Sequence, residues 1–107
     1  MIDTIYENIP NEMFQNYLKF LIGRVFKILF MQEEKNPDLT KYLESLLHEL
    51  TGSLDLMKAI RYDGDFLKLL NKIQFLIGNN TDHCIVRKEV LECTNIIEKL
   101  QNRYGFE

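Results

Sequence analysis

Four stretches of this sequence repeat large apolar residues every three or four positions, and short groups rich in glycine, asparagine, aspartate and proline separate them. This spacing places the apolar side chains on one face of an α-helix. No segment has the two-residue alternation of a strand. Helices joined by short connections pack side by side with opposite directions. The pattern therefore predicts an all-α fold, an antiparallel up-down four-helix bundle, with residues 1–107 forming a single domain.

The predicted helices span about residues 11–34, 38–61, 65–77 and 82–103. Each has an apolar stripe that we expect to lie in a shared core. The four stripes, in chain order, are Phe14, Leu18, Leu21, Val25, Ile28 and Leu29; Leu39, Leu43, Leu46, Leu50, Met57 and Ile60; Phe66, Leu69, Leu70, Ile73, Leu76 and Ile77; and Val86, Val90, Cys93, Ile97, Leu100 and Tyr104.

Residues with turn and capping preferences indicate where these helices begin and end. Asn36, followed by proline and aspartate, predicts a capped start for the second helix. Gly64 is expected to close that helix in a left-handed conformation, and Asp65 to cap the third. By the same reasoning, Gly78 ends the third helix and Thr81 begins the fourth.

Two further features concern the shape of the bundle. The apolar register of the second helix continues through Gly52, with Ser53 in a core position, so we expect one helix rather than two. Residues 2–9 place Ile2, Ile5 and further apolar side chains on one helical face. This spacing favours a short additional helix at the N-terminus.

Charge and targeting signals narrow the class of protein. The formal net charge is −3 and the isoelectric point about 5.4, which argues against broad nucleic-acid binding. The start of the chain does not resemble a signal peptide. The most apolar stretch, residues 17–31, contains three basic residues, so we expect no membrane insertion. A cytoplasmic location is the expectation, and the many Lys, Asn and Ile residues favour a bacterial or phage source.

No residue pattern indicates a catalytic centre, a metal site or a cofactor-binding or small-molecule site. His48 and His83 lack a second ligand at a metal-binding spacing. Cys84 is the strongest candidate for a reactive side chain, because a helix N-terminus favours the thiolate form of a cysteine. Asp82 opposes that effect, and we see no oriented base. A small thiol enzyme around Cys84 is therefore the third-ranked hypothesis, and Cys93 should face away from Cys84.

The second-ranked hypothesis is a nucleic-acid-associated regulator that uses the outer faces of the third and fourth helices. Basic residues beside an aromatic ring can form a platform for single strands. Glutamates dilute this surface, and the net charge of the chain opposes it, so nucleic acid is not the expected partner. The residues concerned are Lys68, Lys72, Phe75, Arg87, Lys88, Lys99 and Arg103.

The leading hypothesis rests on large apolar residues that fall outside the core stripes. Phe20 and Phe30 project into the polar arc of the first helix, Phe75 lies among basic residues of the third, and Leu91 lies on the polar side of the fourth. Exposed apolar residues that cluster indicate a contact surface. The alternative is that these side chains pack beneath residues 2–9 or under Phe106. We therefore expect a non-enzymatic interaction protein that binds a protein partner or forms a homodimer.

Overall fold

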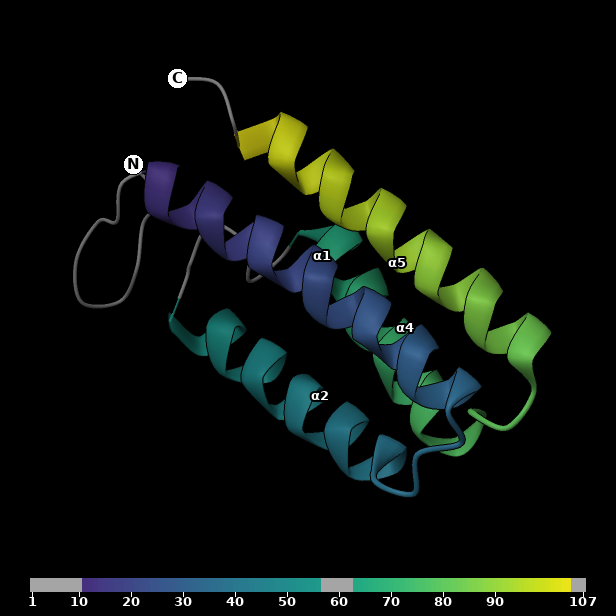
Figure 1. Cartoon of the computed structure of the whole chain (residues 1–107). Helices are drawn as coiled ribbons and strands as arrows, with labels where there is room; N and C mark the ends of the chain where they lie inside the picture. Colours follow the sequence, from purple (N-terminus) through teal and green to yellow (C-terminus); the bar gives the residue numbers. More distant parts are fainter. Residues whose placement is uncertain (1–10, 57–62, 105–107) are drawn as a thin grey trace.

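The computed structural model describes residues 11–56 and 63–104. These residues form four α-helices, which are α1 (Asn11–Glu33), α2 (Leu39–Leu56), α4 (Gly64–Gly78) and α5 (His83–Tyr104). Figure 1 shows the helices lying side by side with their long axes roughly aligned. The predicted helix over residues 2–9 and the second-helix positions beyond 56 lie outside the described residues.

The antiparallel bundle predicted from the sequence is confirmed. α1 packs against α5 and, less extensively, against α2, while α4 packs against both α2 and α5, so α1 and α4 lie diagonally opposite each other. Near the start of α1, Gln15 donates to the carbonyl of Gln101 at the end of α5, with a distance of 3.1 Å. Near the end of α1, Gln32 donates to the Thr81 carbonyl just before α5. These two contacts fix the opposite directions of α1 and α5.

The predicted apolar stripes supply most of the hydrophobic core. Leu29, Leu70 and Ile77 lie at its edge, where they are half-buried. Met31 and Ile96 are buried although the stripes do not include them. The stripe residues that the structure buries are Phe14, Leu18, Leu21, Val25, Ile28, Leu39, Leu43, Leu46, Leu50, Phe66, Leu69, Ile73, Leu76, Val86, Val90, Cys93, Ile97 and Leu100.

Hydrogen bonds join α1 to α2, where the apolar packing is less extensive. The hydroxyl groups of Tyr17 and Ser53 lie 2.9 Å apart, and Ser53 also bonds the Glu49 carbonyl within α2. Burial raises the pKa of Tyr17, so the phenol stays protonated. The Tyr42 hydroxyl donates to the Arg24 carbonyl at 2.8 Å. α2 also continues through Gly52 without a break, as expected.

Aspartates cap α4 and α5, and the capping residues predicted from the sequence are wrong at both positions. Asp63, not Asp65, caps α4, because its Oδ1 atom accepts from the backbone N–H groups of Asp65 and Phe66. Asp82, not Thr81, does the same for α5 through the N–H groups of residues 84 and 85. Gly64 is not a left-handed helix stop, because it is the first residue of α4 and has no positive φ. Gly78 is the last residue of α4, as predicted, but it too has no positive φ.

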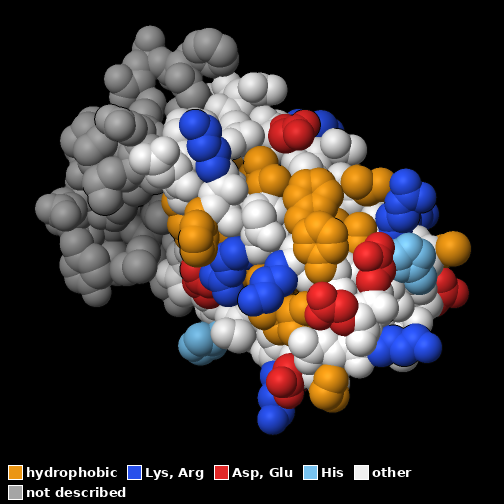
Figure 2. All heavy atoms as spheres, in the orientation of Figure 1, with side chains coloured by type: hydrophobic (Ala, Val, Ile, Leu, Met, Phe, Trp, Pro, Cys, Tyr) orange, Lys and Arg blue, Asp and Glu red, His pale blue; other side chains and the backbone are white. Residues whose placement is uncertain are grey.

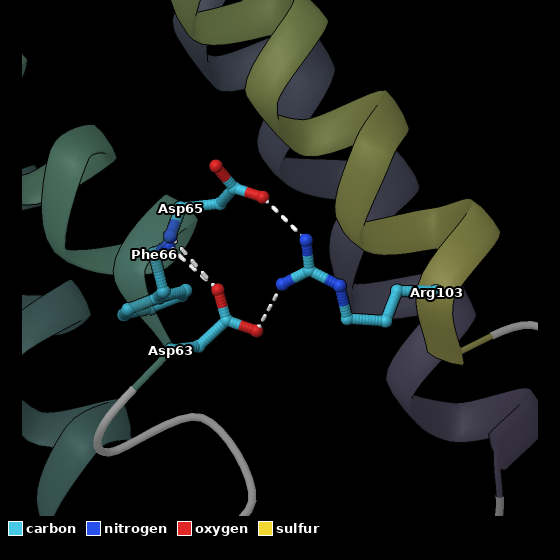
Figure 3. A network of polar contacts seen from close by, with 4 residues as sticks. All are labelled: Asp63, Asp65, Phe66 and Arg103. Carbon is cyan, nitrogen blue, oxygen red and sulfur yellow. Dashed lines mark hydrogen bonds and ion pairs between the residues drawn. The ribbon is translucent and has the colours of Figure 1, made fainter.

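The carboxylate that caps α4 also ties α4 to the end of α5. Figure 3 shows the guanidinium of Arg103 between Asp63 and Asp65, at 2.5 Å from one oxygen of each. The Asp63 side chain is almost fully buried beneath this contact. Hydrogen bonds to Asp63 and then Asp65 raise the pKa of Arg103, so the charge of the guanidinium is permanent.

A left-handed residue ends α1. Lys35 has φ 54°, and its N–H bonds the Gln32 carbonyl, while the Asn36 N–H bonds the Met31 carbonyl. This pair of bonds is the Schellman arrangement, in which the left-handed position is usually glycine. Asn36 then forms the turn that leads into α2, because its side chain accepts a hydrogen bond from the Asp38 N–H at 2.9 Å. α2 itself begins at Leu39.

We expect Lys35→Gly to stabilise the protein by about 1 kcal/mol, because glycine has no Cβ atom to strain a left-handed backbone. The measurement is the free energy of unfolding from urea titration. Lys35→Ala is the matched control, since it removes the charged chain and keeps the Cβ atom. Equal stability of the two variants would show that the backbone at this position is not strained.

We expect Asp63→Ala to destabilise the protein by about 1–2 kcal/mol through loss of the helix cap. Asp63→Asn should lose less, because an asparagine side chain also caps a helix but does not pair with the guanidinium. Thermal unfolding followed by circular dichroism compares the two. If both variants lose the same stability, the cap contributes nothing beyond the ion pair.

Candidate interaction surface

All four apolar residues that the sequence places outside the core are exposed. Phe20 exposes 64% of its surface, Phe30 57%, Phe75 45% and Leu91 43%. Aromatic side chains are usually mostly buried, so exposures above one half for two phenylalanines on one helix are uncommon. α1 is therefore the helix that carries the two most exposed large apolar side chains of the described residues.

The fold brings only part of this set together. Phe20 and Phe30 lie on α1, and Leu91 lies on α5, the helix packed most extensively against α1. Phe75 lies on α4, diagonally across the bundle from α1. Because α4 does not pack extensively against α1, Phe75 lies on a different outer face from Phe20 and Phe30. Figure 2 shows the α1 side of the bundle, where hydrophobic side chains are exposed among charged ones.

A hollow between α1 and α2 lies beside Phe20. The guanidinium of Arg24 is 6.0 Å from the ring centres of both Phe20 and Tyr42, and the Lys27 ammonium is 5.3 Å from the Tyr42 ring. Such contacts between cations and ring faces hold the long basic side chains close to the surface. The hollow is lined by Lys19, Phe20, Gly23, Arg24, Lys27 and Tyr42.

The charges along α1 are unevenly distributed. Arg24 pairs with Glu49 of α2. Neither Lys19 nor Lys27 pairs with a carboxylate among the residues that the structure describes. Glu33 lies in the last turn of α1, where its carboxylate is 4.0 Å from the Nε2 atom of His83 on α5, and Glu12 lies in the first turn. The two lysines lie between these acidic ends of the helix.

Two basic residues of the nucleic-acid hypothesis are bound within the protein. Lys72 contacts Glu89 at 3.0 Å and Glu92 at 2.5 Å, across the seam between α4 and α5. Burial acts against the Lys72 charge, but the hydrogen bonds that Lys72 donates to the two glutamates outweigh it and raise the pKa of Lys72. Arg103 is held by Asp63 and Asp65. A phosphate backbone would have to displace these carboxylates, which weakens the case for this surface.

The two cysteines have different surroundings. Cys84 is exposed in the first turn of α5, where the Asp82 carboxylate accepts its backbone N–H. The imidazole of His83 contacts α1 instead of forming a pair with the Cys84 thiol, because its Nδ1 atom lies 2.8 Å from the Gln32 amide oxygen. Cys93 is buried, and its burial raises the pKa of the thiol to about 12. Across residues 11–56 and 63–104, no three His, Cys, Asp or Glu side chains converge as metal ligands.

Several residues of the α1 face were not identified from the sequence. Tyr42 and Arg24 line the hollow because α2 runs antiparallel beside α1, and no local pattern reveals that pairing. Outside the α1 face, Leu67 of α4 and Ile85 of α5 are also exposed, each 39%. Their off-stripe positions on a helical wheel are the signal that would have indicated their exposure.

The chain matches no protein-family model, no curated protein and no solved structure. Within the described residues, no helix is both long enough and apolar enough to cross a membrane. The candidate interaction surface therefore rests on the exposure and position of its own residues, without support from a related protein.

We expect an aromatic disulfide reagent at pH 8 to modify one thiol of the native protein and two thiols of the unfolded protein. Cys84 is accessible, whereas Cys93 is buried and stays protonated far below a pKa of about 12. The absorbance of the released thiolate counts the reacting groups. Cys84→Ser should remove the fast reaction entirely; a fast reaction that persists would show that Cys93 is accessible in the native bundle.

Proposed function

We propose that this protein is a small non-enzymatic interaction module that acts through protein–protein contacts made by the outer face of α1. The observation that carries the proposal is the exposure of Phe20 and Phe30 on one helix. Both side chains lie outside a core that α1 already fills with its inner stripe. Burial of a phenylalanine side chain contributes about 1.5–3 kcal/mol, so covering both rings supplies a substantial driving force.

The surroundings of the two rings support a protein partner over a small ligand. An interface typically has aromatic and apolar residues at its centre and charged residues at its rim. Lys19 and Lys27 flank Phe20, and Glu33 follows Phe30 within one turn. This arrangement extends along most of α1, which is the scale of a contact between helices. We further propose that the contact forms in the cytoplasm, where an exposed thiol such as Cys84 stays reduced.

The test replaces both aromatic side chains by polar ones. We expect Phe20→Ser with Phe30→Ser to keep the helical circular dichroism spectrum and to abolish association. Light scattering coupled to size exclusion, from micromolar to high micromolar concentration, measures self-association. Cross-linked capture from the native host measures binding to other proteins.

Phe75→Ser is the matched control, because this residue has similar chemistry and exposure but lies across the bundle from α1. It should leave association unchanged. If the double variant unfolds, the two rings belong to the core. If it folds and associates as the unaltered protein does, the outer face of α1 is not the contact surface.

A further inference from the structure

The outer face of α1 has a second regular stripe, separate from the one that enters the core. Its members are spaced by four, three, four, three and four residues, so the spacing is the same when read from either end of the helix. Such steps keep the side chains on one face of a helix, and the exposed apolar members of this face are Phe20 and Phe30. The stripe consists of Asn16, Phe20, Gly23, Lys27 and Phe30 of α1, and of Glu34, which directly follows the last residue of the helix.

We propose that the occupant of this face is a second copy of the chain, with the two α1 helices packed antiparallel about a twofold axis. This proposal rests on the proposed function and names its partner. A twofold contact requires a surface that complements itself. When the stripe is paired with its own reverse, Phe20 lies beside the second copy's Phe30, and the reverse contact follows by symmetry. Both exposed rings of each copy are then covered at once.

The centre of the stripe has the space that such a pairing needs. In the reversed register, Gly23 lies opposite the second copy's Lys27. A Cβ atom built on Gly23 would meet no atom within 4 Å, so the backbone here is open to solvent. The long aliphatic part of a lysine can lie across this flat position while its ammonium reaches the rim. A larger residue at 23 would hold the two helices apart.

The charges select the antiparallel direction. In the reversed register, Lys19 lies within one helical turn of the second copy's Glu33, and symmetry repeats this contact at the other end. Asn16 lies opposite the second copy's Glu34. A parallel pairing would instead place Lys27 beside the second copy's Lys27 and Glu34 beside its Glu34. Opposite charges at the rim of an interface favour the first arrangement over the second.

The decisive experiment exchanges the charges of this rim. Lys19→Glu alone and Glu33→Lys alone should each weaken dimerisation about tenfold at low salt, because two attractive contacts become repulsive. The double variant K19E/E33K should recover most of the affinity, since it restores both contacts in the opposite sense. A mixture of the two single variants should form heterodimers in preference to either homodimer. Sedimentation equilibrium of the full chain measures each dissociation constant.

Lys68→Glu on α4 is the matched control, because it makes the same charge change on the opposite side and should leave the dimer unaffected. Gly23→Leu should also prevent dimerisation without unfolding the monomer. A monomer at all concentrations, or a double variant no better than the single ones, would overturn the proposal. If the monomer still captures another protein through Phe20 and Phe30, only the second copy as partner is wrong. If capture is also absent, the proposed function fails as well.

Discussion

The bundle is closed by the packing of α1 against α5, the two described helices that lie farthest apart in the sequence. α1 packs less extensively against α2, its neighbour along the chain, and the hydrogen bonds of Tyr17 and Tyr42 supplement that contact. α4 then joins α2 to α5 on the other side. The position of every surface follows from this arrangement, because it decides which two faces of each helix are covered and which remain exposed.

The core could be read from the sequence because burial follows helical periodicity. Residues such as Leu18 and Val25 recur on one face, and a single buried face accounts for nearly all of them. The helix ends could not be read as well. Asp65 and Thr81 are both suitable capping residues in isolation. In the structure the carboxylates of Asp63 and Asp82 accept the first N–H groups of α4 and α5 instead, so the sequence offered neighbouring candidates for each cap without choosing between them.

The exposed aromatics were predictable one at a time, and their arrangement was not. A helical wheel places Phe20, Phe30 and Phe75 outside the core stripes, and all three are exposed. Whether they share a surface depends on the order of helices around the bundle, which local periodicity does not encode. The ion pairs of Lys72 and Arg103 were missed for the same reason, since each joins residues of different helices. A basic side chain on a predicted outer face can therefore have its charge already compensated.

The contact of Arg103 with Asp63 has a consequence for the order of events during synthesis. The capping aspartate of α4 emerges from the ribosome about forty residues before the arginine that covers it. Until then, α4 has its cap but not the contact with α5, and α1 lacks the helix against which it packs most. A nascent chain that stops before α5 thus exposes the inner stripe of α1 as well as its outer one. Of the described helices, α5 is made last, and it determines which face of α1 remains available to a partner.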